Sequence, residues 1–448
     1  MSKVLEKAVF SQLINYLEGR NIVHPNLHGS RAGHDTSTAL LQLCDKWVQE
    51  VEQGKMIGVL FCDQSAAFDL CDHSILLQKL EVMGLNESSL FWIKNYLSGR
   101  KQSCFIDGEL SAPLSLFDCG VPQGSIGGPL LWLAFTCDQP DVIHDHVIDG
   151  NNVNRGCIDQ DCGELVGYVD DGAYSFGHKV PDILSQVLTE KYQLLKNWMD
   201  SNKLVLNPDK THLMVLGSRK TVVQRQQVNI MAGDFLVTPS ETEKLLGAHV
   251  HSSLKWNYHL SEAKDSLLKQ IISRNNALKR VCQNAKFETK LMIANGAFLS
   301  KLVYMINVWG GAPKYLLKAL QVQQLVAART VCGYQSLRWS KLKLLQKTRW
   351  LSVRQLVEYH CILQAHKTLI TRKPALLHAA LSDSYPYHTR SASHGDIRLD
   401  KNVSMNTFAY RAMVSYNKVP SKVKEGSMLT VKRNVKKWIQ RNIPLDYT

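Results

Sequence analysis

The segment MIGVLFCD, residues 56–63, restricts the fold of this 448-residue chain more than any other stretch. It is a continuous apolar run of strand length, whereas a half-buried strand would alternate apolar and polar residues. The run therefore predicts a buried strand. Its last residue, Asp63, is expected at the rim of a sheet.

Helical spacing of apolar residues and Gly or Pro stop signals predict most of the remaining structure. Helices are expected at residues 3–18, 36–54, 73–85, 88–100, 182–208, 428–442 and over nearly all of 259–370. Strands are expected at 212–217 and 243–250, and hairpins at Asp107-Gly108 and 167–176. This order predicts an α+β fold, because strands and helices do not alternate as in a doubly wound parallel sheet.

The stretch GYVDDGAYSF, residues 167–176, places Asp170 and Asp171 in a hairpin. Asp-Gly between apolar residues is a strong turn signal, so Asp171-Gly172 is interpreted as the turn dipeptide. Two functions remain open for the pair. The carboxylates are either a solvated hairpin tip or ligands for a metal ion.

Asp63 bears on this choice. If its strand lies beside the hairpin, three carboxylates converge and need cations between them. Mg²⁺ prefers oxygen ligands, and two such ions can activate a hydroxyl and stabilise a leaving pyrophosphate. The alternative is that Asp63 only caps the helix that follows its strand.

A glycine-rich loop, GVPQGSIGGPLL at residues 120–131, runs into an apolar helix. Its glycines permit close approach of a backbone or a base, and Gln123 offers an amide beside them. The loop matches neither a Walker A loop nor a dinucleotide fingerprint. An isolated loop of this kind is commonly only a turn.

Charge is distributed unevenly. Residues 251–448 contain 33 Lys and Arg and 9 Asp and Glu. Residues 1–250 contain 20 Lys and Arg and 30 Asp and Glu. An acidic part with candidate metal ligands followed by a basic part favours chemistry in the first and nucleic-acid binding in the second. The alternative is that the basic residues only solvate helix faces.

Scattered cysteines and the lack of an apolar secretory segment predict an intracellular protein of the nucleus or cytoplasm, not a secreted one. No apolar run is long enough for a membrane span. His144, His146, Cys157 and Cys162 lie in a polar insertion at 138–163 and include ligand types suited to zinc. Their spacing matches no zinc-finger pattern.

Six motifs occur in the order found in reverse transcriptases of non-LTR retrotransposons, the jockey-like LINE-type elements. They are HGSRAGHDTSTALLQL, FCDQSAAFD, GVPQGSIGGPLL, GYVDD, LNPDKTHLMVLG and LLGAHVHSSLKWNYHL. The resemblance covers most of the chain. It implies a right-hand polymerase that copies RNA into DNA, with Mg²⁺ or Mn²⁺ as cofactor. Its partners would be an RNA template, a DNA primer or nicked target DNA, and deoxynucleoside triphosphates, with no membrane.

Carried over by position, the resemblance makes Asp63, Asp170 and Asp171 the carboxylates that hold two metal ions. Phe68 falls where the family has an aromatic steric gate that excludes a 2′-hydroxyl. Lys210, in NPDKT, matches a lysine that protonates the leaving pyrophosphate, with a solvated lysine after a Pro turn as the alternative.

Nucleotide contacts follow from the same resemblance. Gln123 and Gly124 correspond to the loop that touches the incoming nucleotide and the template, and Arg31 is a candidate phosphate contact. LLGAHV resembles a primer grip. The implied domains are partial fingers and palm at 1–250, a helical thumb at 251–335 and a basic C-terminal region at 336–448.

Departures from the family pattern leave other functions open. Ser30 stands where the family usually has Phe, and Ala66 where it often has Lys. The upstream finger segment would precede Met1, so the chain is expected to be N-terminally truncated. The rival hypothesis is an inactive remnant that only binds nucleic acid. A polymerase that makes RNA fits the Asp-Asp hairpin but not Phe68.

Overall fold

The computed structural model describes residues 2–115, 118–143, 163–382, 396–398 and 403–446. These residues form two compact units. Unit 1 is built from Met1–Asp35 and Gly54–Ser240, and unit 2 from Thr36–Gln53 and Glu241–Thr448. The segment Thr36–Gln53 therefore belongs to unit 2, although unit 1 supplies the sequence on both sides of it.

Unit 1 is organised around a five-stranded sheet of order β11-β8-β1-β7-β6. The central strand β1 is antiparallel to both of its neighbours, and β11 pairs with β8 in parallel. The strands are β1 (Met56–Ser65), β6 (Glu164–Tyr168), β7 (Asp171–His178), β8 (Val205–Leu216) and β11 (Pro239–Ser240).

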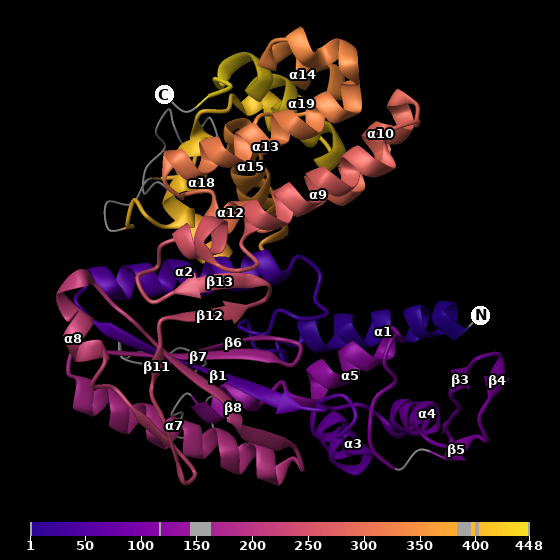
Figure 1. Ribbon diagram of the computed structural model, residues 1–448. Helices are drawn as coiled ribbons and strands as arrows, with labels where there is room; N and C mark the ends of the chain where they lie inside the picture. The colour runs from indigo at the N-terminus through magenta and orange to yellow at the C-terminus, as the bar shows by residue number, and fades with distance from the viewer. Residues whose placement is uncertain (1, 116–117, 144–162, 383–395, 399–402, 447–448) are drawn as a thin grey trace. The chain divides into compact units, whose positions relative to one another are not determined.

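Strand β1 confirms the buried strand that its apolar run predicts. Met56, Val59 and Leu60 are almost completely inaccessible to solvent. Helix α7 (Pro181–Ser201) lies along one face of the sheet (Figure 1). A Cβ atom at Gly58 would lie 2.3 Å from Leu188 of that helix, so glycine allows α7 to pack directly on β1.

Helices and short hairpins surround the sheet of unit 1. The helices besides α7 are α1 (Ser2–Gly19), α3 (His73–Val82), α4 (Glu87–Leu97), α5 (Gly127–Phe135), α6 (Gln139–Ile143), η1 (Arg219–Thr221) and α8 (Val222–Arg225). The short strands are β2 (Lys101–Gln102), β3 (Phe105–Ile106), β4 (Glu109–Leu110), β5 (Leu114–Ser115), β9 (Ile230–Ala232) and β10 (Phe235–Val237).

Two local predictions in unit 1 have different outcomes. The Asp107-Gly108 hairpin is confirmed, with φ of 50° and 90° at its two turn residues. The helix predicted to run to Asn207-Pro208 is too long, because α7 ends at Ser201. Asn207-Pro208 lies within β8, where the strand is irregular rather than absent.

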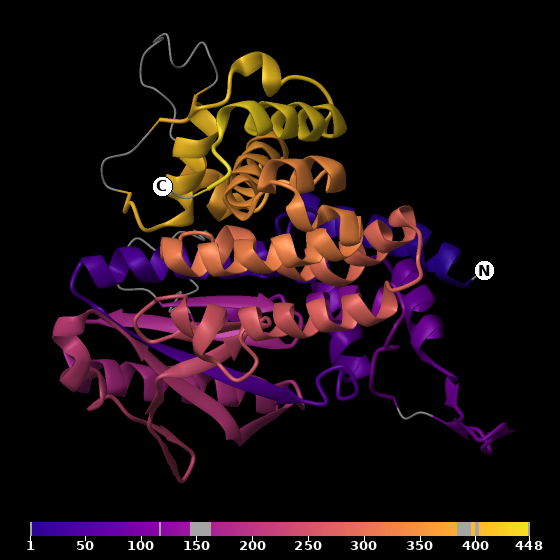
Figure 2. The same cartoon turned by 45° about the horizontal axis from the view of Figure 1, so that its top comes forward.

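Unit 2 is mainly helical, with one small hairpin. Its elements are α2 (Thr36–Glu52), β12 (Thr242–Leu245), β13 (Ala248–His251), η2 (Tyr258–Glu262), α9 (Leu267–Val281), α10 (Phe287–Ala294), η3 (Asn295–Leu299), α11 (Ser300–Val303), α12 (Ile306–Trp309), α13 (Lys314–Cys332), η4 (Tyr334–Arg338), α14 (Lys341–Thr348), α15 (Val353–Thr371), α16 (Ala375–Leu381), α18 (Phe408–Asn417), η5 (Ser421–Val423) and α19 (Met428–Asn442). Helices α9 and α13 run side by side (Figure 2), and the Asn275 amide donates to the Gln323 carbonyl at 3.1 Å.

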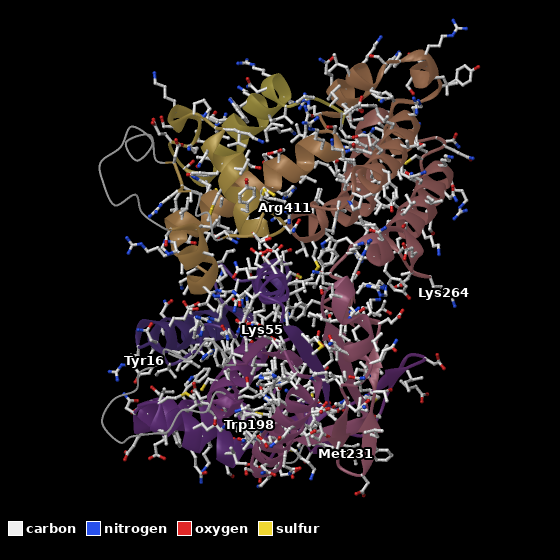
Figure 3. All side chains as sticks on the ribbon, turned by 90° about the vertical axis from the view of Figure 1, so that its left-hand side faces the viewer. Tyr16, Lys55, Trp198, Met231, Lys264 and Arg411 are labelled. Atoms are coloured by element: carbon white, nitrogen blue, oxygen red, sulfur yellow. The ribbon has the colours of Figure 1, made fainter. Side chains whose placement is uncertain are left out.

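Helix α2 is joined to unit 2 by a buried cap. The two oxygens of Asp45 accept the backbone N–H groups of Phe408 and Ala409, at 2.6 and 2.8 Å. These N–H groups begin α18 and have no partner within the helix. Burial raises the pKa of the Asp45 carboxyl to about 6. Arg411, labelled in Figure 3, donates to the carbonyls of Asn307 and Val308.

The α+β class is confirmed by the sheet of unit 1 and the helices around it. In the described part of the chain, no helix is both long and apolar enough to cross a membrane. The cysteines that the structure describes are all free thiols. The boundaries of the two compact units fall after residues 35, 53 and 240. The functional segments expected from the sequence end instead at residues 250 and 335.

Candidate active site

The hairpin with the two adjacent aspartates turns at Val169 and Asp170. Strand β6 ends at Tyr168, which pairs with Asp171, the first residue of β7. Val169 has a φ of 63°, as the first loop residue of a type II′ turn requires. A β-branched residue rarely adopts this conformation, so neighbouring contacts must stabilise it.

The interpretation of Asp171-Gly172 as the turn dipeptide is therefore wrong. Gly172 pairs with Gly167 on one side and with Cys62 of β1 on the other. A Cβ atom at Gly172 would lie 3.1 Å from the ring of Tyr174. This glycine serves close packing within the sheet, and the turn forms before it. Asp170 and Asp171 are both exposed at the tip.

Strand register brings Asp63 to this tip. Asp63 follows Cys62 in β1, and Cys62 is the partner of Gly172. The residue before Gly172 is Asp171, and the turn residue Asp170 precedes it. Two backbone segments far apart in the sequence therefore place three aspartate positions at one end of the sheet.

On its other side, β1 pairs with β8, and this pairing is irregular at Asp63. Cys62 pairs with Thr211 of β8, whereas Gln64 pairs with Leu206, so Asp63 alone faces residues 207–210. The Thr211 hydroxyl donates to the Asn207 carbonyl at 3.1 Å and closes this bulge. Bulges are frequent next to active sites because they redirect side chains. The bulge carries the exposed Lys210 to a position across from Asp63 in the backbone ladder.

Trp132 of α5 is a site residue that the sequence analysis missed. Its indole N–H donates to the carbonyl oxygen of Val169 at 2.8 Å. Its ring stacks on Phe68, with centroids 5.6 Å apart and planes 26° apart. Trp132 therefore joins the expected sugar gate to the aspartate turn. In the sequence it was indistinguishable from the other apolar residues of its helix.

Residues 26–30, which contain the motif HGS and are named the HGS brace, contact the hairpin from another side. The carbonyl of Gly167 accepts the His28 N–H at 2.8 Å, and the Gly167 N–H donates to the Asn26 carbonyl at 3.1 Å. A Cβ atom at Gly29 would lie 2.8 Å from the backbone nitrogen of Val169. Glycine is therefore required where the loop touches the turn.

Phe68 and the Gln123 loop form one surface. The Phe68 carbonyl accepts the Val121 N–H at 2.8 Å. The Gln123 amide donates to the Asp69 carboxylate at 3.3 Å. Gln123 and Gly124 are exposed, and Gly124 has a φ of 76°. The gate and the loop expected to contact nucleotide thus lie together.

The next two glycines of the loop have an internal role. A Cβ atom at Gly127 would lie 2.2 Å from the ring of Phe10, and one at Gly128 would lie 2.5 Å from the Pro122 carbonyl oxygen. Both glycines therefore allow α5 to start in close contact with its neighbours. Of the two partners expected for these glycines, a backbone or a base, the contact at Gly128 is with backbone.

Arg31 is engaged within the protein. Its guanidinium donates to Glu18 at 3.1 Å and to the carbonyls of His24 and Leu27 at 2.9 and 2.7 Å. Its side chain is only 10% exposed. These contacts close the loop before the HGS brace. A contact with phosphate stays a prediction, and it would require release of Glu18.

The carboxylates at the tip fit a divalent cation. Asp170 and Asp171 offer exposed oxygen ligands, the kind that Mg²⁺ prefers. Cys62 and Tyr174 beneath them are buried, and this burial raises the pKa of the Cys62 thiol to about 12 and that of Tyr174 well above its usual value. Among the side chains that the structure describes, which do not include Asp63, no group of three forms a metal cluster. The candidate zinc ligands His144, His146, Cys157 and Cys162 lie outside the described residues.

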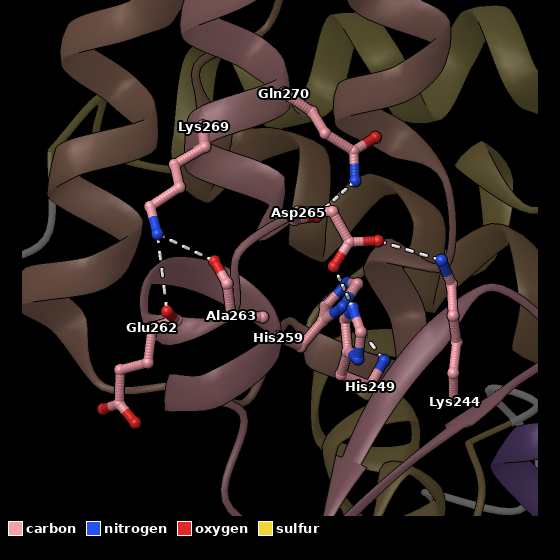
Figure 4. Close-up of polar contacts among 8 residues, drawn as sticks. All are labelled: Lys244, His249, His259, Glu262, Ala263, Asp265, Lys269 and Gln270. Carbon is pink, nitrogen blue, oxygen red and sulfur yellow. Dashed lines mark hydrogen bonds and ion pairs between the residues drawn. The ribbon is translucent and has the colours of Figure 1, made fainter.

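In unit 2, the hairpin expected to be a primer grip is bound to Asp265, in the link that precedes α9 (Figure 4). Asp265 accepts from Lys244 of β12 at 2.9 Å and lies 2.6 Å from Nε2 of His249 in β13. These contacts lower the pKa of Asp265 to about 2. The ring of His259 accepts the His249 N–H at 3.2 Å, and burial lowers the pKa of His259 to about 4.

Comparison with known proteins gives one family. Residues 1–250 match the family described as reverse transcriptase (RNA-dependent DNA polymerase). The probable RNA-directed DNA polymerase from transposon BS of Drosophila melanogaster is 26% identical over 341 residues, 75% of this chain and 35% of the relative. The RNA-directed DNA polymerase from mobile element jockey of Drosophila funebris is 24% identical over 335 residues, 74% of this chain and 34% of the relative.

The chain thus spans about a third of the length of these curated relatives. Among solved structures, apo telomerase from Candida tropicalis gives a TM-score of 0.43 at 11% identity, covering 83% of this chain and 58% of that one. The sequence matches confirm the resemblance to jockey-like elements.

Proposed function

Because the chain belongs to the reverse transcriptase family, we propose that it catalyses RNA-directed DNA synthesis. The reaction is the template-directed transfer of a deoxynucleotide to a primer 3′-hydroxyl. One observation supports this most directly: the register that pairs Cys62 with Gly172 and so joins Asp63 to the Asp170-Asp171 turn.

We assign Asp63, Asp170 and Asp171 as the ligands for Mg²⁺. When bound, two such ions would lower the pKa of the primer hydroxyl and stabilise the leaving pyrophosphate. The contribution of the chain is to hold the carboxylates at one end of the sheet formed by β1 and its neighbours β7 and β8. The sheet ladder and the HGS brace keep this arrangement rigid.

The neighbouring residues would select and orient the nucleotide. Phe68, supported by Trp132, would lie under the sugar and exclude a 2′-hydroxyl. Gln123 and Gly124 would contact the incoming nucleotide and the template. Lys210, carried by the bulge of β8, would donate a proton to the leaving pyrophosphate.

The partners follow from the same function. We propose an RNA template, a DNA primer or nicked target DNA, and deoxynucleoside triphosphates. Fingers and palm would lie within 1–250, and the basic helices of 251–335 would act as a thumb that contacts the phosphate backbone. Residues 336–448 form a basic C-terminal region. The site of action would be intracellular, in the nucleus or cytoplasm.

Primer extension tests the carboxylates. With a DNA primer on an RNA template and Mg²⁺, Asp63→Asn and Asp170→Asn should each abolish extension, because an amide cannot replace a charged metal ligand. Asp234→Asn is the matched control, an exposed aspartate in the turn between β9 and β10 of the same unit. Near-normal extension by both site variants would refute the metal assignment. A parent chain that binds the template and primer but does not extend would favour the inactive remnant.

A further inference from the structure

Unit 2 contains a pocket of about 580 Å³ far along the chain from the carboxylates. It lies between residues of α10, η3, α11, α15 and α19 and the link from α14 to α15. Leu299 and Leu351 contribute to its apolar lining, and Arg349, His360 and Lys436 are its basic side chains. Of the described residues that line it, none has a carboxylate.

Two positive charges converge in this pocket. Lys436 donates its Nζ to the backbone carbonyl of Arg349 at 2.9 Å. Burial lowers the pKa of Lys436, and the charge of Arg349 lowers it further. Among the described residues, no hydrogen bond or ion pair occupies the guanidinium of Arg349. Two cations without a compensating acid are an arrangement that a bound anion stabilises.

The backbone at Arg349 bears on how the site can be tested. Arg349 caps the C-terminus of α14 in the left-handed conformation, with a φ of 56°. Glycine is favoured at this position of a helix, because a Cβ atom strains the left-handed backbone. Arg372 caps α15 in the same conformation, so this backbone sets where the Arg349 side chain leaves the helix and is not by itself a sign of a ligand.

We propose that this pocket binds a phosphate group of a nucleotide or a nucleic-acid strand, with Arg349 and Lys436 as its ligands. The planar guanidinium matches the oxygens of phosphate, and the ammonium adds a point charge. The apolar lining would accommodate the adjoining sugar. Tyr359 lines the same pocket and offers an aromatic ring for a base.

This site is separate from the candidate active site and does not depend on polymerase activity. It gives a role to the C-terminal region, since α19 and the link after α14 supply both ligands. A phosphodiester of a strand and a free triphosphate present the same chemistry. The test therefore uses one probe of each kind.

The first probe is a fluorescein-labelled single-stranded deoxyoligonucleotide without a terminal phosphate. Its binding to the full chain is measured by fluorescence anisotropy in EDTA, so that metal-dependent binding does not contribute. Arg349→Gly and Lys436→Gln should each raise Kd about five- to tenfold. Lys437→Gln, the neighbouring exposed lysine of α19, should change Kd less than about twofold.

The second probe is inorganic tripolyphosphate, measured by isothermal titration calorimetry in EDTA. Loss of oligonucleotide affinity identifies a strand as the source of the phosphate, and loss of tripolyphosphate affinity alone identifies a free nucleotide. Arg349→Gly relieves the left-handed strain, so its thermal midpoint should equal that of the parent or exceed it by about 2 °C. Weaker binding without loss of stability then excludes a merely structural role.

The proposal is overturned if Arg349→Gly and Lys436→Gln bind both probes as the parent does. It is also overturned if Lys437→Gln weakens binding as much as they do, since the effect would then be one of general surface charge.

Discussion

At the scale of single residues, Trp132 connects two features that are separate in the sequence. Its ring supports Phe68, and its indole N–H satisfies the carbonyl of the strained turn residue Val169. A left-handed β-branched residue needs such support, because the conformation is intrinsically unfavourable. We therefore expect Trp132 to position the turn without touching substrate.

Trp132→Phe keeps an aromatic platform but removes the donor to Val169. The rate constant of primer extension should fall about tenfold, because small displacements of reacting groups have large effects, while ribonucleotide exclusion is retained. Trp132→Ala should also admit ribonucleotides, because Phe68 loses its stacking partner. Single-turnover extension with deoxy- and ribonucleotides measures both.

The matched control is Trp309→Phe in unit 2, which loses the same kind of bond. The indole of Trp309 donates to the Tyr304 carbonyl at 2.8 Å. Trp309→Phe should lower the free energy of unfolding by about 1 kcal/mol, as Trp132→Phe does, and leave the extension rate unchanged. An equal rate loss in both variants would show that Trp132 acts through global stability alone.

At the scale of elements, the β12–β13 hairpin depends on a charge network around Asp265 (Figure 4). His259 is buried beneath it with a pKa of about 4. In an unfolded chain the pKa of a histidine is about 6.5. Between these values the unfolded state binds more protons, so the free energy of unfolding falls as the pH is lowered.

We expect His259 to remove up to about 3 kcal/mol of stability between neutral pH and pH 4. His259→Gln has no charged form and should reduce the difference in urea midpoint between pH 7 and pH 5. His360, whose pKa is also about 4 through burial, should leave a residual dependence, and Asp45, whose pKa is raised to about 6, should offset part of it because its sign is opposite. Asp265 has a depressed pKa, so its contribution is lost only below about pH 4. An unchanged pH dependence in His259→Gln would contradict the assignment.

At the scale of the whole molecule, the two units are not consecutive in the sequence. Helix α2 belongs to unit 2, although unit 1 flanks it in the sequence, and it supplies Trp47, which is 0% exposed, and the cap at Asp45. Asp45 and Phe408 are 363 residues apart. Unit 2 therefore completes its fold only with a segment synthesised long before it.

Asp45→Ala should destabilise the start of α18 by about 1–2 kcal/mol, because two N–H groups lose their acceptors. Hydrogen exchange should accelerate at the N-terminus of α18 and stay unchanged in β1 of unit 1. Gln49→Ala on the same helix is the control and should leave both segments unchanged. Faster exchange in β1 as well would indicate that the two units unfold together.

Local patterns predicted much of the fold. Helix α19 lies at residues 428–442, as its apolar spacing indicates, and β1 is the buried strand that its composition requires. Where one local signal is compatible with two structures, the sequence did not predict which of them forms. Asn207-Pro208 ends helices in general but here forms a strand bulge, and the turn falls at Val169-Asp170 rather than at Asp171-Gly172.

By itself, the sequence determined most of the helices, the buried strand β1, the family resemblance and the positions of the candidate carboxylates, because these depend on residue type and spacing. Only the tertiary structure decided which segments meet. Register joined Asp63 to the hairpin, the fold enclosed Arg31 among carbonyls, and packing brought Trp132 to the turn. Such contacts depend on segments distant in the chain, and a single sequence contains no local signal for them.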